Sequence, residues 1–118
     1  LSNNLNELTD FMFHHCYNLK NVEIPDTITE IPYGAFYGCT KLASVKLPAN
    51  LKKIDATAFI SCVNLTEIKI PPTVKEIGRS AFKNCRRLET VNMTSSEDMV
   101  IHKSAFKDTP YAKTKDTK

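Results

Sequence analysis

The chain has 118 residues, enough for one domain, and its hydrophobic fraction of 42% and charged fraction of 25% are ordinary for a folded protein. It contains no apolar run of about 18 residues or more, so we expect no insertion into a membrane. The net charge is +3, and the basic residues are dispersed except for a local excess in the tail at Lys113, Lys115 and Lys118, so we expect no nucleic-acid partner.

A 23-residue period organises the chain. The cysteines mark this period most clearly, and a phenylalanine precedes each of them by three positions. These two columns are Cys16, Cys39, Cys62 and Cys85, and Phe13, Phe36, Phe59 and Phe82. A period of about 20 to 29 residues with regular aliphatic positions is typical of leucine-rich repeats. We therefore predict a leucine-rich repeat solenoid of about four repeats, whose stacked units share a core of residue ladders.

The N-terminal segment begins in the middle of a repeat. Leu1, Leu5 and Leu8 already occupy apolar columns, and no polar cap precedes them. Two interpretations are open: the chain is cut from a longer array, which we favour, or Leu1 to Asn6 forms a minimal cap. An open coil at this end would expose leucines beside an unpaired strand edge, so we expect a tendency to self-associate through it.

Each following unit begins with a strand. Leu42, Val45 and Leu47 fit the Leu-x-x-Leu-x-Leu strand pattern, and Pro48 should end the strand because proline has no N–H to donate. Strands of successive units should pair in parallel at a spacing of about 4.8 Å. The pattern predicts a parallel sheet on the concave face of a right-handed coil of the α/β type.

A shorter extended segment and a turn complete each unit. Leu51 and Ile54 begin the second extended segment. Residues 55–59 then reverse the chain, and we predict one short helical turn there, capped by Asp55 or Thr57.

The last unit departs from the period. Phe106 lies 24 residues after Phe82, which places one inserted residue within residues 94–99. Thr109 stands where the next cysteine would fall, so the repeat is ending there.

These boundaries divide the chain into two parts. Residues 1–111 form the predicted leucine-rich repeat domain. Residues 112–118 are expected to form a mobile tail, because chain ends are poorly ordered unless they dock.

The repeated unit Cys-x-x-Leu-x-x-Val/Ile-x-Ile/Leu-Pro, continued by Ala-Phe-x-x-Cys, resembles the BspA-like, or Treponema pallidum-type, leucine-rich repeat. Residues 34–39 and 77–85 are close to this pattern, and the likeness covers about residues 1–111. The resemblance implies a non-enzymatic adhesion module of an extracellular or cell-surface protein, whose partner is a protein ligand such as a host or extracellular matrix protein. The family's motif residues are structural, so the resemblance transfers no catalytic residue and no cofactor.

Two other functions stay open at this stage. The repeats could be a structural spacer that presents another domain of a larger protein. Alternatively, they could accompany a catalytic domain that lies outside these residues. Paired carboxylates, a phosphate-binding loop and a nucleophile elbow are absent from the sequence, so we do not expect an enzyme here.

The candidate binding face is formed by the residues that alternate with the buried strand positions. These residues are Asn21, Glu23, Ser44, Lys46, Glu67, Lys69, Thr90 and Asn92. They are polar and mixed in charge, whereas interface hot spots favour Trp, Tyr and Arg, so plain solvated strands are an equal alternative. Tyr33 and Tyr37 should lie together on the opposite, turn-bearing side, with Tyr17 near them, as a second candidate surface.

The cysteines and histidines are assigned structural roles. A column of thiols about 4.8 Å apart cannot surround one zinc ion, whose bonds to sulfur are about 2.3 Å long. The same spacing disfavours disulfides, so we expect free, buried thiols. His14 and His15 fall on a turn without converging carboxylates, and we expect neither a metal site nor a catalytic site there.

Overall fold

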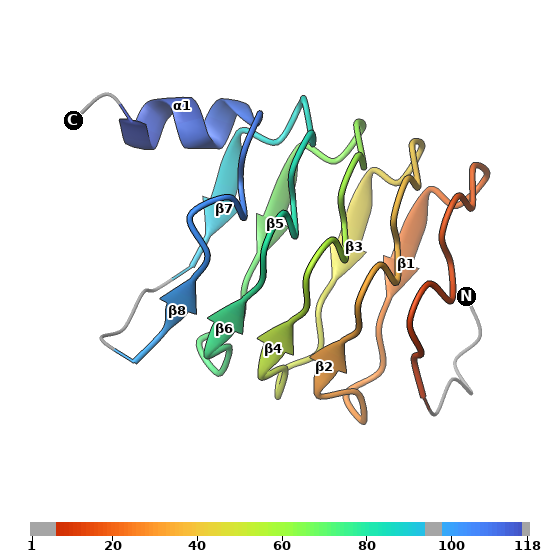
Figure 1. Cartoon of the computed structure of the whole chain (residues 1–118). Coiled ribbons are helices and arrows are strands. Elements are labelled where there is room, and N and C mark those ends of the chain that lie inside the picture. Colours follow the sequence, from red (N-terminus) through yellow and green to blue (C-terminus); the bar gives the residue numbers. More distant parts are fainter. Residues whose placement is uncertain (1–6, 94–97, 117–118) are drawn as a thin grey trace.

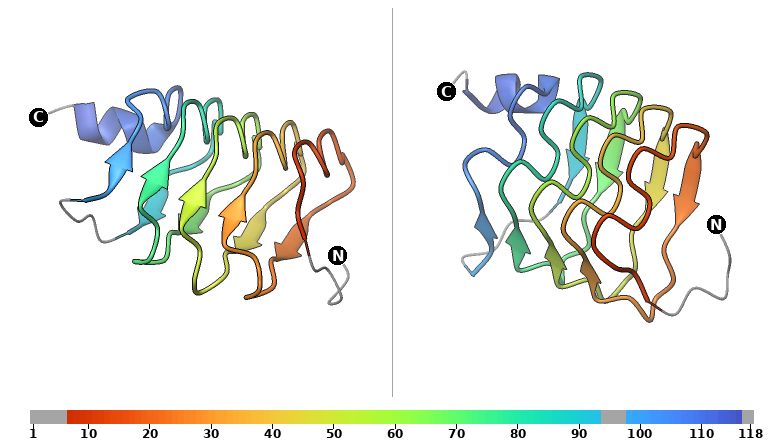
Figure 2. Two further views of the ribbon diagram at one scale, coloured as in Figure 1. Left: turned by 60° about the horizontal axis from the view of Figure 1, so that its bottom comes forward. Right: turned by 45° about the vertical axis from the view of Figure 1, so that its right-hand side comes forward.

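The computed structural model of the chain describes residues 7–93 and 98–116. These residues form a flat solenoid with extents of 44 × 29 × 19 Å. Successive coils lie side by side along its long axis, and short parallel strands form two layers, one on each face (Figures 1 and 2). We name each coil by its phenylalanine, from the Phe13 coil to the Phe106 coil. The predicted leucine-rich repeat solenoid is confirmed.

The three-residue strands form one layer. They are β1 (Asn21–Glu23), β3 (Ser44–Lys46), β5 (Glu67–Lys69) and β7 (Thr90–Asn92). β1 pairs with β3 and β5 pairs with β7, both in parallel and with partners 23 residues apart, as the period predicts. β3 and β5 are neighbours in space but belong to separate hydrogen-bonded pairs. We call this layer the long-strand face.

The two-residue strands form the other layer. They are β2 (Glu30–Ile31), β4 (Lys53–Ile54), β6 (Glu76–Ile77) and β8 (Val100–Ile101). All four join in one continuous parallel sheet, so the shorter segments, and not the longer ones, make the unbroken sheet. Ile77 pairs with Ile101, 24 residues on, which confirms one inserted residue between Asn92 and Val100. We expected the insertion within residues 94–99. Residues 94–97 of that segment are not among the described residues.

The turn segments contain no helical turn, contrary to our prediction for residues 55–59. In each of the first four turn segments two residues adopt left-handed backbone angles, for example Thr57 at φ 58° and Ser61 at φ 63°, and in the last segment Asp108 does. Left-handed residues interrupt a right-handed helix, so the chain makes successive tight turns instead. The Asp55 carboxylate accepts a hydrogen bond from the next backbone N–H, that of Ala56, at 2.7 Å, and caps no helix.

Backbone hydrogen bonds also link the turn segments of neighbouring coils. The N–H of Phe36 donates to the carbonyl of Ala58 at 2.8 Å, and the N–H of Phe59 donates to that of Ala81 at 2.7 Å. This third line of bonds satisfies turn groups that would otherwise be orphaned near the core. It also holds the phenylalanines of successive coils in register.

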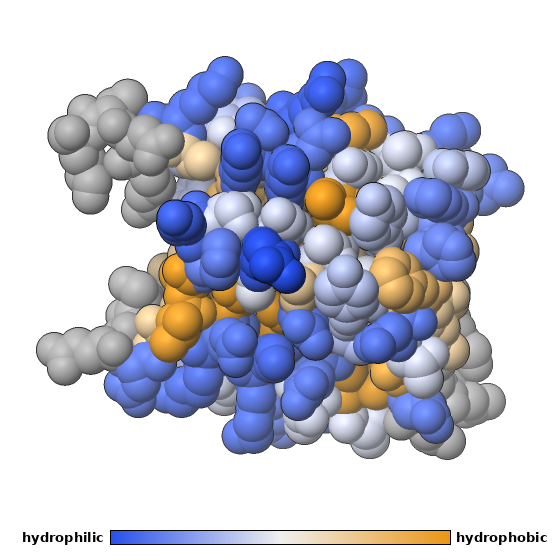
Figure 3. All heavy atoms as spheres, viewed as in Figure 1, coloured by the Kyte–Doolittle hydropathy of each residue, from blue (hydrophilic) through white to orange (hydrophobic). Residues whose placement is uncertain are grey.

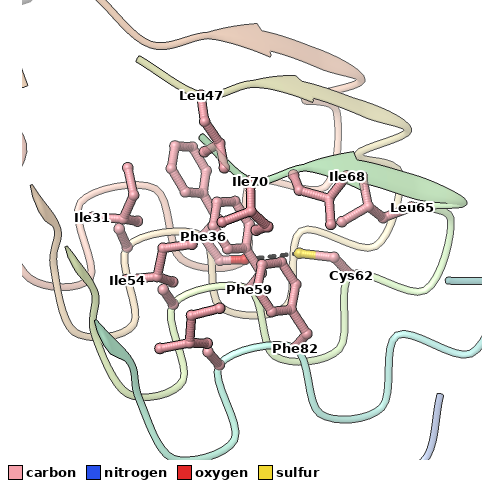
Figure 4. Close-up of a cluster of buried hydrophobic side chains, with 14 of the residues drawn as sticks. Ile31, Phe36, Leu47, Ile54, Phe59, Cys62, Leu65, Ile68, Ile70 and Phe82 are labelled. Carbon is pink, nitrogen blue, oxygen red and sulfur yellow. Dashed lines mark hydrogen bonds between the residues drawn. The ribbon is translucent and has the colours of Figure 1, made fainter. Parts of the chain in front are cut away.

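The core consists of ladders of like residues between the two strand layers (Figure 4). Phe36 and Phe59 stack with ring centroids 5.2 Å apart and planes 3° from parallel. Every neighbouring pair of phenylalanines from Phe13 to Phe106 is stacked at 5.2 to 5.4 Å. Phe36, Phe59 and Phe82 are fully buried, whereas Phe13 at the N-terminal end of the ladder is half-buried. Each coil therefore depends on its neighbours for burial.

The described C-terminal residues form a helix that takes in residues 112–116 of the expected tail, and residues 117–118 lie outside the described residues. Helix α1 (Pro110–Asp116) is the one helix in the described part of the chain (Figure 1). Thr109 caps it: its Oγ1 accepts from the N–H of Ala112 at 3.0 Å and donates to the carbonyl of Phe106 at 2.6 Å. Pro110 occupies the first helical position, where its missing N–H costs nothing. The residue that replaces cysteine in the last coil thus starts a terminal helix.

Helix α1 also packs on part of the last coil, whereas Val100 and Ile101 of β8 stay exposed. The Tyr111 ring packs edge-on against Phe106, with ring centroids 5.0 Å apart. Within the described residues, no helix is long and apolar enough to cross a bilayer.

Candidate binding surfaces

The long-strand face carries all eight residues that the sequence proposed for binding. Each of them lies on β1, β3, β5 or β7, and each is exposed, while the residue between each pair points into the core. The period-two alternation of a strand explains this placement. The structure therefore brings these residues onto one surface, and their role in binding stays a prediction.

Contacts on this face are polar and weak. Ser44 Oγ donates to Asn21 Oδ1 at 2.7 Å, and Lys46 Nζ lies 3.7 Å from a Glu23 carboxylate oxygen. Both charged side chains are exposed, and such pairs contribute only about 0 to 1 kcal/mol. An open depression of about 550 Å³ is lined by Glu23, Lys46 and Lys69 of this face, together with aliphatic residues and prolines that follow the strands. The long-strand face thus offers hydrogen-bonding groups but no aromatic anchor.

Aromatic rings gather instead on the turn side of the first two coils. This aromatic cluster consists of Phe11, His14, His15, Tyr17, Tyr33 and Tyr37. Phe11 contacts Tyr33 edge-on, with ring centroids 5.1 Å apart, and lies 6.3 Å from Tyr37. Tyr17 joins through His15, which stacks on it at 5.6 Å. The expectation that the three tyrosines lie together is confirmed.

Phe11 is the member of the aromatic cluster that the sequence did not single out. In the following coils its column holds small turn residues, Gly34, Thr57 and Ser80. A phenylalanine among them has no core position to fill, and it is 40% exposed. The large aromatic residue at a position that holds a small residue in the other coils was the sequence signal that could have identified Phe11 as a surface residue.

Two glycines make room for these rings. Gly34 and Gly38 have φ angles of 63° and 71°, a conformation that glycine adopts without steric cost. A Cβ atom at Gly34 would lie 2.4 Å from a ring carbon of Phe11, and one at Gly38 would lie 2.4 Å from a ring carbon of His15. The rings of the Phe13 coil therefore lie directly against the backbone of the Phe36 coil.

The two histidines of the cluster take part in ring and backbone contacts. His14 Nδ1 donates to the carbonyl of Phe11 at 2.7 Å, and the His15 ring lies between Tyr17 and Tyr37. Among the described residues there is no group of three or more His, Cys, Asp or Glu side chains arranged to hold a metal ion.

Three cysteines of the column are buried, and Cys16 at its N-terminal end is half-buried. All four cysteines are free thiols. Three of them donate through Sγ to a phenylalanine carbonyl of the preceding coil, at 3.0 to 3.3 Å: Cys39 to Phe13, Cys62 to Phe36 and Cys85 to Phe59. Burial raises the pKa of Cys39 to about 11 and that of Cys85 to about 12, and it raises the pKa of Cys62 well above its usual value. These thiols stay protonated at neutral pH, and a protonated thiol is a poor nucleophile.

The solenoid architecture and the repeated core define a leucine-rich repeat protein. The sequence profile described as BspA type Leucine rich repeat region matches residues 1–113 in six copies. The chain belongs to this family, as its motif indicated.

Solved structures of bacterial leucine-rich repeat proteins share the fold. A leucine-rich repeat protein of T. pallidum is 37% identical, with a TM-score of 0.68 over 69% of this chain and 38% of the other. A leucine rich cell surface protein of Faecalibacterium prausnitzii is 37% identical, with a TM-score of 0.73 over 77% of this chain and 24% of the other. A leucine-rich repeat protein from Bacteroides capillosus is 35% identical, with a TM-score of 0.65 over 74% and 62%.

The chain spans less than two thirds of the length of each of these structures. A comparison with curated proteins found no match.

Proposed function

We propose that this chain is a non-enzymatic protein-binding module of a bacterial surface or secreted protein, and that the aromatic cluster is its main contact surface. The observation that carries the proposal is the exposure of apolar and aromatic rings on one rigid edge of the solenoid. Tyr17 is 55% exposed, and Phe11 and Tyr33 are each 40% exposed. Aromatic residues on a surface are the side chains that most often dominate a protein interface.

The rings are held in place before any partner binds. Phe11 contacts the rings of His14, Tyr33 and Tyr37, and it packs against the backbone at Gly34. Immobilising a flexible side chain at an interface costs about 0.5 to 1.5 kcal/mol, and ordered rings avoid part of that cost. The cluster is therefore organised for binding in the free protein.

The surface location of the module is supported by its relatives. One similar solved structure is described as a leucine rich cell surface protein, that of Faecalibacterium prausnitzii. We propose an extracellular or cell-surface location for this chain as well, with a host or extracellular matrix protein as its partner.

A structural spacer is the second candidate. The continuous core and the packing of helix α1 on Phe106 are consistent with a spacer, because both features stabilise the solenoid and neither provides a contact surface. A pure spacer gives no reason for the exposed rings of the Phe13 coil, so we place protein binding first.

The test is a binding assay of the 118-residue chain against a panel of immobilised extracellular matrix proteins. The double variant Phe11→Ala/Tyr33→Ala should lose about tenfold or more in affinity, equivalent to about 1.4 kcal/mol or more. The matched control Glu23→Ala/Lys46→Ala, on the long-strand face, should stay within about twofold of wild type. Far-UV circular dichroism should show both variants folded.

Other outcomes would redirect the proposal. A loss confined to the control variant would move the binding site to the long-strand face. If the wild-type chain binds no protein of the panel, the binding proposal fails and the structural spacer becomes the favoured function.

A further inference from the structure

Cationic side chains collect on the turn side of the Phe82 and Phe106 coils. This basic stripe consists of Arg79, Lys83, Arg86, Arg87, Lys103 and Lys107. All are exposed except Lys83, which is half-buried. In the sequence these residues look dispersed, but the repeat register places Lys103 beside Arg79 and Lys107 beside Lys83. Hydrophilic residues accordingly cover the turn segments above β6 and β8 (Figure 3).

Backbone bonds fix this register. The N–H of Phe82 donates to the carbonyl of Ala105 at 2.7 Å, and the N–H of Asn84 donates to that of Lys107 at 2.9 Å. Coils bonded in this way lie about 4.8 Å apart. Like charges are therefore held close to each other by the fold, at an electrostatic cost that a ligand of opposite charge would relieve.

Among the described residues, the cations of the basic stripe form no ion pair. Arg86 Nε donates to Asn84 Oδ1 at 2.8 Å, and Arg87 Nη1 donates to Asn64 Oδ1 at 3.3 Å, so neutral amides orient both guanidinium groups. The ion pairs among the described residues lie elsewhere, between Lys46 and Glu23, Lys53 and Glu76, and Lys75 and Asp98. Asp108 is the one carboxylate in the turn segments 78–87 and 102–109.

The charge is specific to these two coils. The corresponding turn segments 9–18, 32–41 and 55–64 contain one cation, Lys41, and two carboxylates, Asp10 and Asp55. The turn side therefore changes along the solenoid from aromatic at the Phe13 end to cationic at the Phe106 end. Two chemically different surfaces on one edge indicate two different ligands.

We propose that the basic stripe binds a sulfated polysaccharide, independently of the protein partner proposed above. The cations are spread over two coils, and the hollows that they line are open: one of about 460 Å³ includes Lys103 and Lys107, and one of about 510 Å³ includes Arg86. This arrangement suits a polymer with repeated anionic groups better than a single small anion.

Proteins that bind single-stranded nucleic acid place aromatic side chains among their cations as stacking platforms. In the basic stripe Phe82 and Phe106 are buried in the core. Tyr111, which lines a hollow with Lys103 and Lys107, packs its ring on Phe106. His102 is the one exposed ring in the turn segments 78–87 and 102–109, so the stripe offers no row of stacking platforms. A polymer whose anions need no stacking is the better fit.

The experiment measures binding of the 118-residue chain to fluorescently labelled heparin by anisotropy at physiological salt. The triple variant Arg86→Gln/Lys103→Gln/Lys107→Gln should lose about tenfold or more in affinity, and its affinity should depend less steeply on salt. A matched control with the same loss of charge, Lys20→Gln/Lys52→Gln/Lys69→Gln, should lose less than about threefold. All substituted side chains are exposed, and equal thermal midpoints should show that both variants remain folded.

Three outcomes would overturn the proposal. Equal losses of heparin affinity in the two variants would show that heparin is attracted by the net charge of the protein and does not bind at the basic stripe. Equal binding to chemically desulfated heparin would show that sulfate groups are not recognised. Tighter binding to a single-stranded oligonucleotide than to heparin would show that the stripe is a nucleic-acid surface.

Discussion

Cys62 donates its Sγ–H to the carbonyl oxygen of Phe36, 3.3 Å away in the preceding coil (Figure 4). That carbonyl also accepts the backbone N–H of Cys39 at 3.2 Å. One oxygen at the corner of a coil is thus satisfied from its own coil and from the next one. This explains why the column holds cysteine and not another small apolar residue such as alanine.

Loss of this thiol should therefore destabilise the protein. We expect Cys62→Ala to lower the free energy of unfolding by about 1 to 2 kcal/mol, from the lost hydrogen bond and the small cavity. Urea denaturation measures the change. Cys16→Ala is the matched control, because Cys16 is only half-buried, and it should cost less than about half as much. Equal costs at both sites would contradict a role for the bond between coils.

The phenylalanine ladder should show the same dependence on position. Phe59 is fully buried and stacks on two neighbours, whereas Phe13 is half-buried and stacks on Phe36 alone among the phenylalanines. We expect Phe59→Ala to cost about 3 to 5 kcal/mol, and Phe13→Ala roughly half of that. Thermal or urea unfolding of the two variants checks the ratio. A larger cost for Phe13→Ala would show that the first coil is the centre of stability.

Two glycines should resist substitution for different reasons. Gly38 has a φ of 71°, and the nearest obstacle to a Cβ is the exposed His15 ring, which can move. Gly78 has no left-handed φ, but a Cβ there would lie 2.7 Å from the backbone nitrogen of Ala56, which cannot rotate away.

We therefore expect Gly38→Ala to cost about 1 kcal/mol, and Gly78→Ala about 2 kcal/mol or more because the packed coils must separate. Urea unfolding midpoints measure both. Adding His15→Ala to Gly38→Ala should recover little stability, since the left-handed backbone angle remains. Full recovery in that double variant would show that the ring and not the backbone sets the cost.

Stability should fall in alkaline solution through the buried thiols. Burial raises the pKa of Cys39 from 9.0 to about 11. Below about pH 9 the thiol is protonated in both states and its contribution to stability is complete. Between about pH 9 and 11 the unfolded state binds fewer protons than the folded state, so the free energy of unfolding decreases as pH rises, by up to about 1.4 kcal/mol per pH unit for this thiol.

Urea unfolding at about pH 8 and about pH 10 measures this loss in wild type and in Cys39→Ala. The variant should lose less stability over the same interval, because it lacks the Cys39 thiol whose ionisation favours the unfolded state. An identical loss in the two proteins would exclude the Cys39 thiol as a cause.

The two ends of the solenoid should differ in self-association. Helix α1 packs on Phe106 of the last coil through Tyr111, while Leu8 and Leu19 of the first coil are partly exposed. Leu1 and Leu5, which the sequence also assigned to this end, lie outside the described residues. We expect a weak association through the N-terminal end, because an open coil there leaves apolar side chains beside an unpaired strand edge.

Light scattering over a range of protein concentrations tests this prediction. Leu19→Glu should shift the distribution toward monomer, whereas Lys107→Glu, near the opposite end, should not. A wild type that is monomeric at the highest concentration would contradict the association.

Much of the fold follows from the sequence because its signals are periodic. A strand alternates its side chains between core and solvent, so the column of Val22, Val45 and Ile68 predicted both the strands and the exposed residues beside them. The insertion before Val100 followed from a change in the same period.

Other features depended on contacts between coils. The helical turn predicted at residues 55–59 is absent because Thr57 and Ser61 adopt left-handed backbone angles. No glycine stands at these positions, so the sequence did not signal that conformation. The helix at Pro110 was missed because Thr109 acts as a cap only once the Phe106 carbonyl and the end of the core are in place.

The candidate surfaces were also predicted in part from the sequence and in part found only in the structure. The sequence by itself determined the eight positions of the long-strand face and the neighbourhood of Tyr33 and Tyr37. Only the tertiary structure added Phe11 to the aromatic cluster and gathered Arg79 and Lys103 into one stripe. The physical reason is that stacking places residues one repeat apart within about 5 Å of each other, a proximity that distance along the chain conceals.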